Sequence, residues 1–476
     1  MHRRCILFAS IHIGVGMDRA SGLGPSGQLV QHSGKRLRIA VVGSGISGLS
    51  AAWMLDRHHD VTLYERDVRT GGHSRTVDVA LGGGRSVPVD TGFIVYNETT
   101  YPNLTRLLAH LGVQTKPSDM SFAVSLDDGA LEYAGSGEIN GLFAQRRNLF
   151  SPRFWSMLLD LFRFYREAPA HAGKLGLVTL GEFLAEHRYG RAFRDDHLLP
   201  MAAAIWSTPT PAILDYPAEA FIRFCENHGL LKIRDRPRWR TVTDGSRSYV
   251  SAMLRQFKGR LCLNRGVAEI ARHNSKVLVT DQVGESEWFD HIVIAAHADQ
   301  ALAMLADPSE HEHEVLSAFR YSRNAAVLHD DAALMPKRVQ TWSSWNYLGR
   351  RNGHGQTNDL CVSYWMNRLQ GIDDPRPLIV TLNPRQTLRA GSVIDNIVFH
   401  HPIFDNAALV AQKALWSLQG ERNTWYCGAY FGAGFHEDGL QAGLSVAEAL
   451  GAQRPWSLAN PSDRLSLPPL ALDIAA

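Results

Sequence analysis

The chain has 476 residues, of which 45% are hydrophobic and 20% are charged, and its formal net charge is +2. This length and composition suit a globular protein of two or three domains, and the charge balance gives no indication of a nucleic-acid partner. The five cysteines are scattered, odd in number and without CxxC spacing, which argues against a disulfide framework or a zinc site. We therefore expect a cytoplasmic protein with no metal centre.

The first 34 residues do not resemble part of a folded domain. Arg3 and Arg4 precede an apolar stretch at 5–15, as in a signal peptide, but that stretch contains His12 and lacks a clear cleavage site. We predict that residues 1–34 form a disordered extension. No stretch of the sequence reaches the ~18 apolar residues of a membrane span, so we expect no transmembrane segment and leave a peripheral membrane contact open.

The first predicted domain begins with a strand and a glycine-rich turn at 38–65. Ile39–Val42 is a short apolar run typical of a buried parallel strand, and Gly43, Gly45 and Gly48 follow it as GxGxxG. In such a motif the first glycine permits the turn, the second lets a pyrophosphate approach the backbone, and the third lets the helix pack on the sheet. The motif therefore predicts a dinucleotide site.

A helix and a second strand complete this unit. The helix, beginning near Ile46 and Ser47, points its free N–H groups at the phosphates. Val61–Tyr64 form the second strand, and Glu65 follows it about 20 residues past the motif, where a ribose hydroxyl needs an acceptor. Because an acid at this position would repel a 2′-phosphate, the unit predicts an adenine dinucleotide that carries none.

Further glycine-rich segments accompany this unit. Gly71–Ser74 and Thr91–Phe93 lie shortly after the second strand. Far along the chain, residues 424–450 are typical of a short strand, a glycine-rich loop and a helix that begins at about Gly439. We therefore expect the C-terminal part of the chain to complete the dinucleotide site.

In their order and residues these motifs resemble the flavin amine oxidase superfamily, which includes amine oxidases, phytoene-type desaturases, protoporphyrinogen oxidases and fatty-acid isomerases. The resemblance covers roughly residues 37–455. It implies an α/β protein, α+β overall, in which a Rossmann-like FAD-binding domain of the amine oxidase or p-hydroxybenzoate hydroxylase type is interleaved with a mixed substrate domain. Other segments look like a bacterial subgroup of predicted NAD/FAD-binding proteins related to fatty-acid desaturases and isomerases: Arg236–Val242, Ser343–Tyr347, Val362–Gln370, His401–Asp405 and Gly434–Gly439.

The resemblance implies FAD rather than NAD, and the distant C-terminal motif agrees, since a flavin that extends between two halves of a protein needs such a partner. We expect the FAD to be non-covalent, because Cys427 lies on the strand before the C-terminal loop. The residues expected to contact FAD are Gly43, Gly45, Ile46, Ser47, Gly48, Glu65, Arg66, Gly71, Gly72, His73, Ser74, Thr91, Gly92, Phe93, Val267, Gly428, Gly434, Phe435, His436, Glu437, Asp438, Gly439 and Leu440.

Three of these residues have alternative interpretations. His73 stands where many members of the superfamily have arginine, and it either contacts the flavin, bonds to it covalently, or lies at a helix start near phosphate. The helix near Gly439 would direct its N-terminus at the flavin and stabilise the reduced form, and Glu437 or Asp438 would serve either that site or only the cap of this helix.

The order of the motifs implies interleaved domains. The FAD-binding domain is expected to comprise residues 35–100, 241–299 and 415–455. The substrate domain is expected to comprise residues 101–240 and 300–414, and a C-terminal tail follows at 456–476.

Three segments outside the cofactor motifs stand out. Phe154–Tyr165 has apolar residues around most of a helix, which predicts a buried helix over the active site or, alternatively, a tunnel wall or a membrane-surface dock for a lipid. Lys232–Arg240 holds five cations in nine residues, as either a solvated loop or a clamp for an anionic headgroup. We interpret the alternating Glu and His of 310–314 as surface.

A bound flavin can accept a hydride from a C–H bond that the protein holds against it in a dry pocket. His401 is the first choice for a general acid–base, although each candidate aromatic residue taken alone also fits a core position. The catalytic candidates are His401, His436, Tyr364 and Asn367, and the candidates for substrate contact are Trp345, Asn346, Tyr347 and Trp365.

Three hypotheses for function follow. The first is an FAD enzyme that desaturates, isomerises or oxidises a lipid-like, unsaturated fatty acyl substrate, as the subgroup resemblance implies. The second is an amine oxidase, which is weakened because no paired tyrosines stand beside the C-terminal motif. The third is a non-catalytic FAD-binding partner of a lipid-modifying enzyme.

Overall fold

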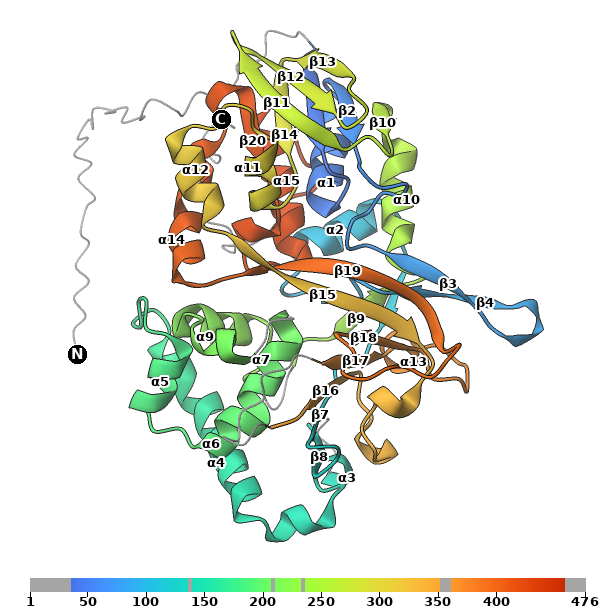
Figure 1. Cartoon of the computed structure of the whole chain (residues 1–476), viewed down its shortest axis with the longest axis vertical. Coiled ribbons are helices and arrows are strands. Elements are labelled where there is room, and N and C mark those ends of the chain that lie inside the picture. The colour runs from blue at the N-terminus through green and yellow to red at the C-terminus, as the bar shows by residue number, and fades with distance from the viewer. Residues whose placement is uncertain (1–35, 136–138, 207–209, 233–235, 352–360, 459–476) are drawn as a thin grey trace, which may run out of the picture.

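The computed structural model describes residues 36–135, 139–206, 210–232, 236–351 and 361–458. Two halves lie on either side of a pair of long strands that cross the middle of the molecule (Figure 1). The predicted extension 1–34 lies outside the described residues, as does most of the predicted C-terminal tail.

The upper half in Figure 1 is built on a five-stranded parallel sheet, which we call the parallel-sheet half. Four of its strands are mainly apolar and buried, as is typical of parallel sheets covered by helices, whereas the edge strand β10 is only partly buried. In spatial order they are β10 (Arg260–Cys262), β2 (Asp60–Tyr64), β1 (Arg38–Val42), β14 (His291–Ile294) and β20 (Thr424–Tyr426).

Two helices from opposite ends of the chain pack against each other beside this sheet. All ten residues of α1 (Ile46–Leu55) are buried, and α15 (His436–Ala449) lies along it. A Cβ on Gly443 would come within 2.1 Å of the Ser47 carbonyl oxygen, so only glycine allows this approach. The other helices of this half are α2 (Pro102–His110), α10 (Arg247–Gln256), α11 (Ala298–Met304), α12 (Glu310–Ser317) and α14 (Asn406–Ala414).

Small sheets accompany the two large ones. The antiparallel β11 to β13 lie over the upper end of the parallel sheet, the hairpin β3–β4 projects to one side, and β9 pairs with β5 and β6 (Figure 1). These strands are β3 (Thr76–Ala80), β4 (Ser86–Asp90), β5 (Tyr96–Asn97), β6 (Thr115–Pro117), β9 (Trp239–Val242), β11 (Val267–His273), β12 (Lys276–Asp281) and β13 (Ser286–Phe289).

The lower half contains a mixed sheet of seven strands, in which β16 and β7 are parallel and the other pairs antiparallel. The two long strands, β15 and β19, form the edge of this sheet that faces the parallel-sheet half (Figure 1). In spatial order the strands are β19 (Val393–Ile403), β15 (Arg320–His329), β18 (Ile379–Leu382), β17 (Val362–Trp365), β16 (Trp345–Gly349), β7 (Phe122–Leu126) and β8 (Leu131–Ala134).

A helical layer lies beside the mixed sheet, around a core that includes Phe164, Phe183, Phe193 and Phe221. No helix among the residues described has both the length and the hydropathy that crossing a membrane requires. The helices of the lower half are α3 (Ile139–Leu142), α4 (Pro152–Glu167), α5 (Leu180–Glu186), α6 (Arg191–Phe193), α7 (Leu199–Trp206), α8 (Thr210–Leu214), α9 (Ala218–Asn227) and α13 (Met366–Leu369).

The structure differs from the sequence analysis in several details. The C-terminal helix begins at His436, three residues before the predicted start. The apolar side chains of α2, α12 and α14 belong to the core of the parallel-sheet half, although the predicted boundaries assign these segments to the substrate domain. Glu312, interpreted as a surface residue, is buried in an ion pair with Arg272, because it closes a capping box at the start of α12.

Candidate functional site

The turn between β1 and α1 forms a cradle of backbone atoms. Gly43 has φ +96°, and a Cβ there would lie 2.7 Å from the Ala295 carbonyl oxygen. A Cβ on Gly48 would lie 1.9 Å from the Gly43 carbonyl oxygen. A Cβ on Gly45, in contrast, would meet no atom within 4 Å. Open space therefore lies beside Gly45 at the N-terminus of α1, where a pyrophosphate would bind.

Glu65 lies at the end of β2, beside this cradle. Its carboxylate accepts the N–H of Ser44 at 2.9 Å and the N–H of Asp67 at 2.9 Å. The Glu65 carbonyl oxygen accepts the N–H of Arg265 at 2.9 Å, which brings the start of β11 at Val267 close to the acid. These hydrogen bonds fix the orientation of Glu65, which would accept a ribose hydroxyl of a bound dinucleotide, while Arg66 next to it is exposed.

The second glycine loop lies directly on the first. The Gly71 N–H donates to the Ser44 carbonyl oxygen at 3.0 Å. A Cβ on Gly72 would lie 3.0 Å from the Gly45 Cα, so the two loops approach more closely than side chains would permit. The backbone of 71–74 therefore forms one wall of the cradle.

The segment 91–93 extends this wall. The Phe93 N–H donates to the His73 carbonyl oxygen at 2.7 Å, and the Thr91 N–H donates to the Arg75 carbonyl oxygen at 2.8 Å. A Cβ on Gly92 would lie 2.1 Å from the His73 carbonyl oxygen. The structure thus brings together the two motifs that the sequence analysis selected separately.

The N-terminus of α15 approaches the same place from the far end of the chain. The His436 ring stacks on Phe93 with centroids 3.9 Å apart, and its Nε2 lies 2.8 Å from the Tyr249 hydroxyl. Tyr249 also hydrogen-bonds to Ser74. Burial lowers the pKa of His436 to about 3, so this imidazole is neutral at physiological pH. The sequence analysis missed Tyr249, although the segment around it at 243–250 was assigned to the FAD-binding domain.

The two acids of the C-terminal motif cap helices. Glu437, fully buried, accepts the backbone N–H and the side-chain amide of Asn103 at 2.9 and 3.0 Å, at the start of α2. Asp438 accepts the N–H of Phe435 at 2.8 Å, at the start of α15. Asp438 therefore has the role that the sequence analysis held as the alternative, the cap of the C-terminal helix. Glu437 caps the start of α2 instead, a contact that the sequence analysis did not predict.

Other residues of that motif shape the loop or pack in the core. The Phe435 ring stacks on Phe224 of the helical layer with centroids 4.7 Å apart. Gly434 has φ +90° and its N–H donates to Ala429, while Leu440 is fully buried. Gly439 allows α15 to approach Ser47 of α1, because a Cβ there would lie 2.9 Å from the Ser47 Oγ. Gly428 joins β20 to this loop.

His401 lies on β19, and a chain of hydrogen bonds fixes its tautomer. The backbone N–H of Ala325 donates to the Asn383 Oδ1 at 2.9 Å, so the Asn383 amide nitrogen is the donor to Asn324 Oδ1 at 2.8 Å. The Asn324 amide nitrogen then donates to His401 Nδ1 at 2.9 Å. With Nδ1 accepting, the proton of neutral His401 resides on Nε2. No sequence motif marks Asn324, whose partner becomes visible only when β15 pairs with β19.

His401 belongs to a group of rings between the two halves. The His73 ring stacks on Phe399 with centroids 4.6 Å apart and lies 5.4 Å from the His401 ring. Burial is the main cause that lowers the pKa of His73 and of His401 to about 3 each, and for His73 the nearby His297, His436 and Arg69 contribute to this lowering. The ring of His400 lies 6.0 Å from that of His297, whose pKa burial lowers to about 4.

The predicted substrate residues lie elsewhere in the mixed sheet. The register pairs Tyr364 with Val380, Val380 with Leu328 and Leu328 with Asp395, which is six residues along β19 from His401. The Trp345 ring packs against Tyr364 at 5.0 Å between centroids. The grouping of these aromatic residues with His401 was therefore wrong, because two strands and six residues of register separate them.

The amides expected in this pocket hold the backbone instead. Asn367 donates to the carbonyl oxygens of Asp374 and Arg376 and accepts the N–H of Leu378, which fixes the following loop. Asn346, fully buried, bonds in the same way to backbone groups of Ser343. Tyr347 is fully buried and Trp365 packs edge-to-face on Trp342. These residues serve the fold of the mixed sheet.

Only part of the basic segment 232–240 is described. The Arg236 Nε donates to the Lys232 carbonyl oxygen, and Arg240 bonds to Thr115 and lies 3.6 Å from Glu98. These contacts match the solvated loop with surface ion pairs.

Three features together define a dinucleotide-dependent oxidoreductase. They are the glycine cradle at the N-terminus of a helix, the acid at the end of the next strand, and the distant helix whose start completes the site. The chain belongs to the family of flavin containing amine oxidoreductases, whose model matches residues 46–329. It is an FAD-dependent oxidoreductase, and the open space beside Gly45 together with the oriented Glu65 fits this cofactor.

Solved structures share the fold at low sequence identity. A protein provisionally assigned as a protoporphyrinogen oxidase from Exiguobacterium sp. 255-15 is 15% identical, with TM-score 0.62, over 87% of this chain and 99% of that one. A fatty acid isomerase from P. acnes that produces CLA is 17% identical, with TM-score 0.58, over 87% and 97%. A cyclohexylamine oxidase from Brevibacterium oxydans IH-35A is 16% identical, with TM-score 0.61, over 87% and 99%. A search of the curated proteins gives no match.

Proposed function

We propose that this FAD-dependent oxidoreductase acts on an apolar, lipid-like substrate, an unsaturated fatty acyl chain, which it desaturates, isomerises or otherwise oxidises. The observation that carries the proposal is the character of the ring group between the halves. His73, His401 and His436 have pKa values lowered to about 3, and Phe93 and Phe399 stack against two of them. A neutral site of this kind suits a hydrocarbon chain.

The charges around this group disfavour an amine. The charged neighbours that lower the pKa of His73 include Arg69, and those of His297 include Arg66. A substrate ammonium would be repelled by these cations, whereas the carboxylate or ester of an acyl lipid would be attracted. The likeness to a fatty acid isomerase and the subgroup resemblance of the sequence support the same choice.

The roles of the chain's own residues follow from the site. The loop at Gly45 and the N-terminus of α1 would hold the pyrophosphate of FAD, and Glu65 its ribose. When bound, FAD supplies a hydride acceptor for a C–H bond. His401, fixed as the Nε2–H tautomer by Asn324, would donate a hydrogen bond to the substrate. The stacked rings would exclude water from the reacting carbon.

An anaerobic titration of the purified holoenzyme tests the proposal. Separate additions of unsaturated fatty acyl lipids and of primary amines are followed by the visible absorbance of the flavin. We expect one of two results. Either lipid lowers the flavin absorbance, or product analysis finds a double-bond isomer of the lipid while the absorbance stays unchanged. Bleaching by amines alone would establish an amine oxidase instead. Failure of every lipid to bleach the flavin or to give a product would refute the lipid proposal.

A further inference from the structure

A patch of exposed apolar side chains covers the lower end of the molecule, next to the helical layer. Phe150 is 86% exposed and Leu159 is 68% exposed. Such contiguous exposed apolar surface is unusual for a protein that has no partner there. We call this set the apolar patch, and its members are Ile139, Leu149, Phe150, Trp155, Leu159 and Phe162.

Helix α4 explains how the patch forms. Its side chains Phe154, Leu158 and Phe164 pack into the protein. Trp155, Leu159 and Phe162, spaced at i, i+4 and i+7, lie in a row on the opposite, exposed face. The helix is therefore apolar on both sides, and only one of its faces is covered by this chain.

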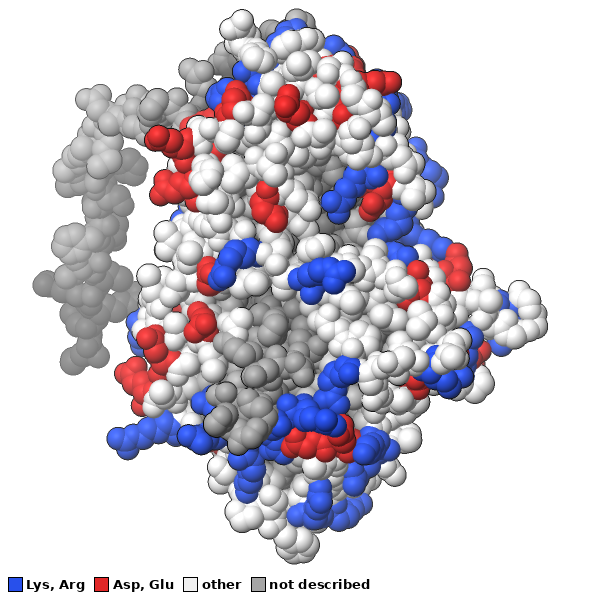
Figure 2. Space-filling view, viewed as in Figure 1, with Lys and Arg blue, Asp and Glu red and all other residues white. Residues whose placement is uncertain are grey.

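Basic side chains border the patch. Arg146 and Arg147 lie on the same short turn, 146–150, as Phe150, and both are exposed. Arg146 bonds to the side-chain oxygen of Asn140 and Arg147 to the carbonyl oxygen of Ala130, so neither charge is neutralised by these partners. Across residues 139–167 the sequence has five arginines and two acids. Three of these arginines form ion pairs, Arg153 with Asp196, Arg163 with Asp160 and Arg166 with Glu167, so Arg146 and Arg147 supply the charge of the border. Figure 2 shows basic side chains gathered over the lower part of the molecule.

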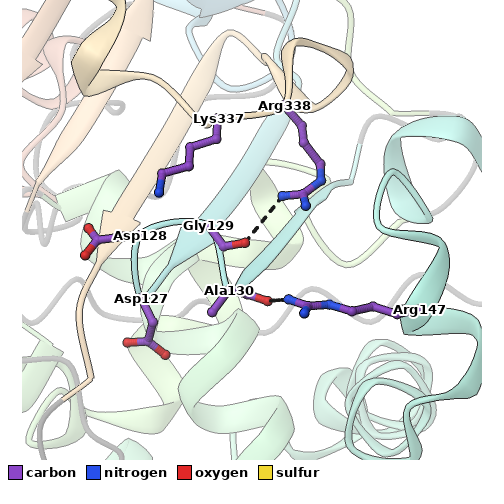
Figure 3. Close-up of a pocket in the computed structure, with 7 residues that line it drawn as sticks. All are labelled: Asp127, Asp128, Gly129, Ala130, Arg147, Lys337 and Arg338. Carbon is purple, nitrogen blue, oxygen red and sulfur yellow. Dashed lines mark hydrogen bonds between the residues drawn. The ribbon is translucent and has the colours of Figure 1, made fainter.

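A hollow of about 570 Å³ continues this basic border. Arg147, Lys337 and Arg338 line it, and Arg147 and Arg338 reach the carbonyl oxygens of the turn between β7 and β8 (Figure 3). The two acids of the hollow are paired, Asp127 with Arg351 and Asp128 with Arg350. Arg338 is paired with the buried Glu132, so Arg147 and Lys337 supply the remaining positive charge of the hollow. The hollow opens beside the apolar patch, because Arg147 and Phe150 lie on the same turn.

We propose that the apolar patch and its basic border dock on the surface of an anionic bilayer. The aromatic and aliphatic side chains enter the boundary between headgroups and acyl chains, and the arginines contact lipid phosphates. Charge complementarity selects this occupant, because the cations at the border are suited to anionic lipid and would repel a second copy of the same border. The inference rests on the proposed function, since a membrane is the source of its acyl substrate.

Vesicle co-sedimentation of the FAD-loaded full chain tests the docking. Vesicles of phosphatidylcholine with phosphatidylglycerol should carry the protein down, whereas phosphatidylcholine alone should do so much less, and high salt should weaken binding. Equal affinity for both vesicles, or binding to neither, would overturn the proposal. Because the assay involves no turnover, vesicle binding by a protein that neither oxidises nor isomerises any acyl lipid would refute the proposed function and leave the docking intact.

Matched variants locate the surface. Trp155→Ala should lower vesicle affinity about tenfold, as expected for one aromatic side chain withdrawn from an apolar phase. Trp288→Ala is the control, because Trp288 is 42% exposed against 44% for Trp155. Trp288 belongs to β13, a strand that lies at the opposite end of the molecule from α4 (Figure 1). The double variant Arg146→Gln with Arg147→Gln should lose about fivefold per arginine on anionic vesicles.

Two outcomes would contradict this placement. Equal losses for the two tryptophan variants would show that the patch has no special role. A dimer in size-exclusion chromatography that Trp155→Ala dissociates, with no vesicle binding, would assign the patch to a second copy of the chain. Unchanged circular dichroism of the variants, expected for exposed positions, separates these outcomes from misfolding.

Discussion

Substitution of Gly45 by valine separates cofactor binding from folding. Gly45 has φ −63° and ψ 176°, an extended conformation that any residue adopts. An added Cβ would meet no protein atom within 4 Å. The free energy of unfolding of the apoprotein should therefore change by no more than about 0.5 kcal/mol. The new side chain would instead occupy the space in which the pyrophosphate approaches the backbone.

The effect on FAD affinity follows from the hydrogen bonds that this approach permits. Each bond from a backbone N–H to a charged phosphate oxygen contributes about 1.5–3 kcal/mol. Loss of two such bonds at the start of α1 would cost about 3–6 kcal/mol. This corresponds to roughly a 10²- to 10⁴-fold increase in the Kd for FAD. Gly45→Val should thus purify as a colourless protein.

Gly48→Ala is the contrasting variant. Its Cβ would lie 1.9 Å from the Gly43 carbonyl oxygen, so the fold itself must shift, at a cost of about 1–3 kcal/mol or more. FAD titration and urea unfolding of both apoproteins check the reasoning. Two results would refute the inference that the glycine cradle binds the pyrophosphate of FAD. One is wild-type FAD affinity in Gly45→Val, and the other is a Gly45→Val apoprotein that is as unstable as Gly48→Ala.

Two further predictions concern the histidines. The carboxylate of Asn324→Asp would accept a hydrogen bond from His401 Nδ1–H and so move the proton of neutral His401 from Nε2 to Nδ1; substrate-dependent flavin reduction should fall about 10- to 100-fold and gain a new ionisation in its pH profile, whereas Asn396→Asp, at an exposed position of the strand that carries His401, should have neither effect. The pKa of His436 is about 3 in the folded protein against 6.5 when unfolded, so the stability it contributes is complete above pH 6.5 and is lost as the pH falls toward 3. Between pH 7 and pH 5 the free energy of unfolding of the wild type, measured with urea, should fall by at most about 2 kcal/mol more than that of His436→Gln. Equal losses in the two proteins would contradict the lowered pKa of His436.

The cofactor side of the site could be predicted because its information is local. The sequence analysis placed the first strand at Ile39–Val42, and the structure has it at Arg38–Val42. The glycines and Glu65 act through the backbone conformation of their own turn, so their spacing alone identifies them. The relay to His401 is different, because Asn324 and His401 are 77 residues apart and meet only through the register of β15 and β19.

The surface of α4 shows another limit of sequence patterns. Leu158 is buried and Leu159 is exposed, and Phe164 is buried whereas Phe162 is exposed. Since both faces carry the same residue types, periodicity could not say which face the protein covers. The aromatic residues around Trp345 were wrongly grouped with His401 for a different reason, because the order and register of the strands between them depend on long-range pairing that the sequence does not reveal.

The contact of α1 with α15 also has a consequence for how the protein is made on the ribosome. About 380 residues separate the two helices, and strand β20 is also synthesised late. At roughly 5–20 residues per second, α1 waits about 20–80 s for the helix that buries it. During that interval an apolar helix lacks its partner and is exposed to chaperones or to aggregation. The cofactor site is completed only when nearly the whole chain has been made, so a premature stop before residue 436 should yield chains that cannot retain FAD.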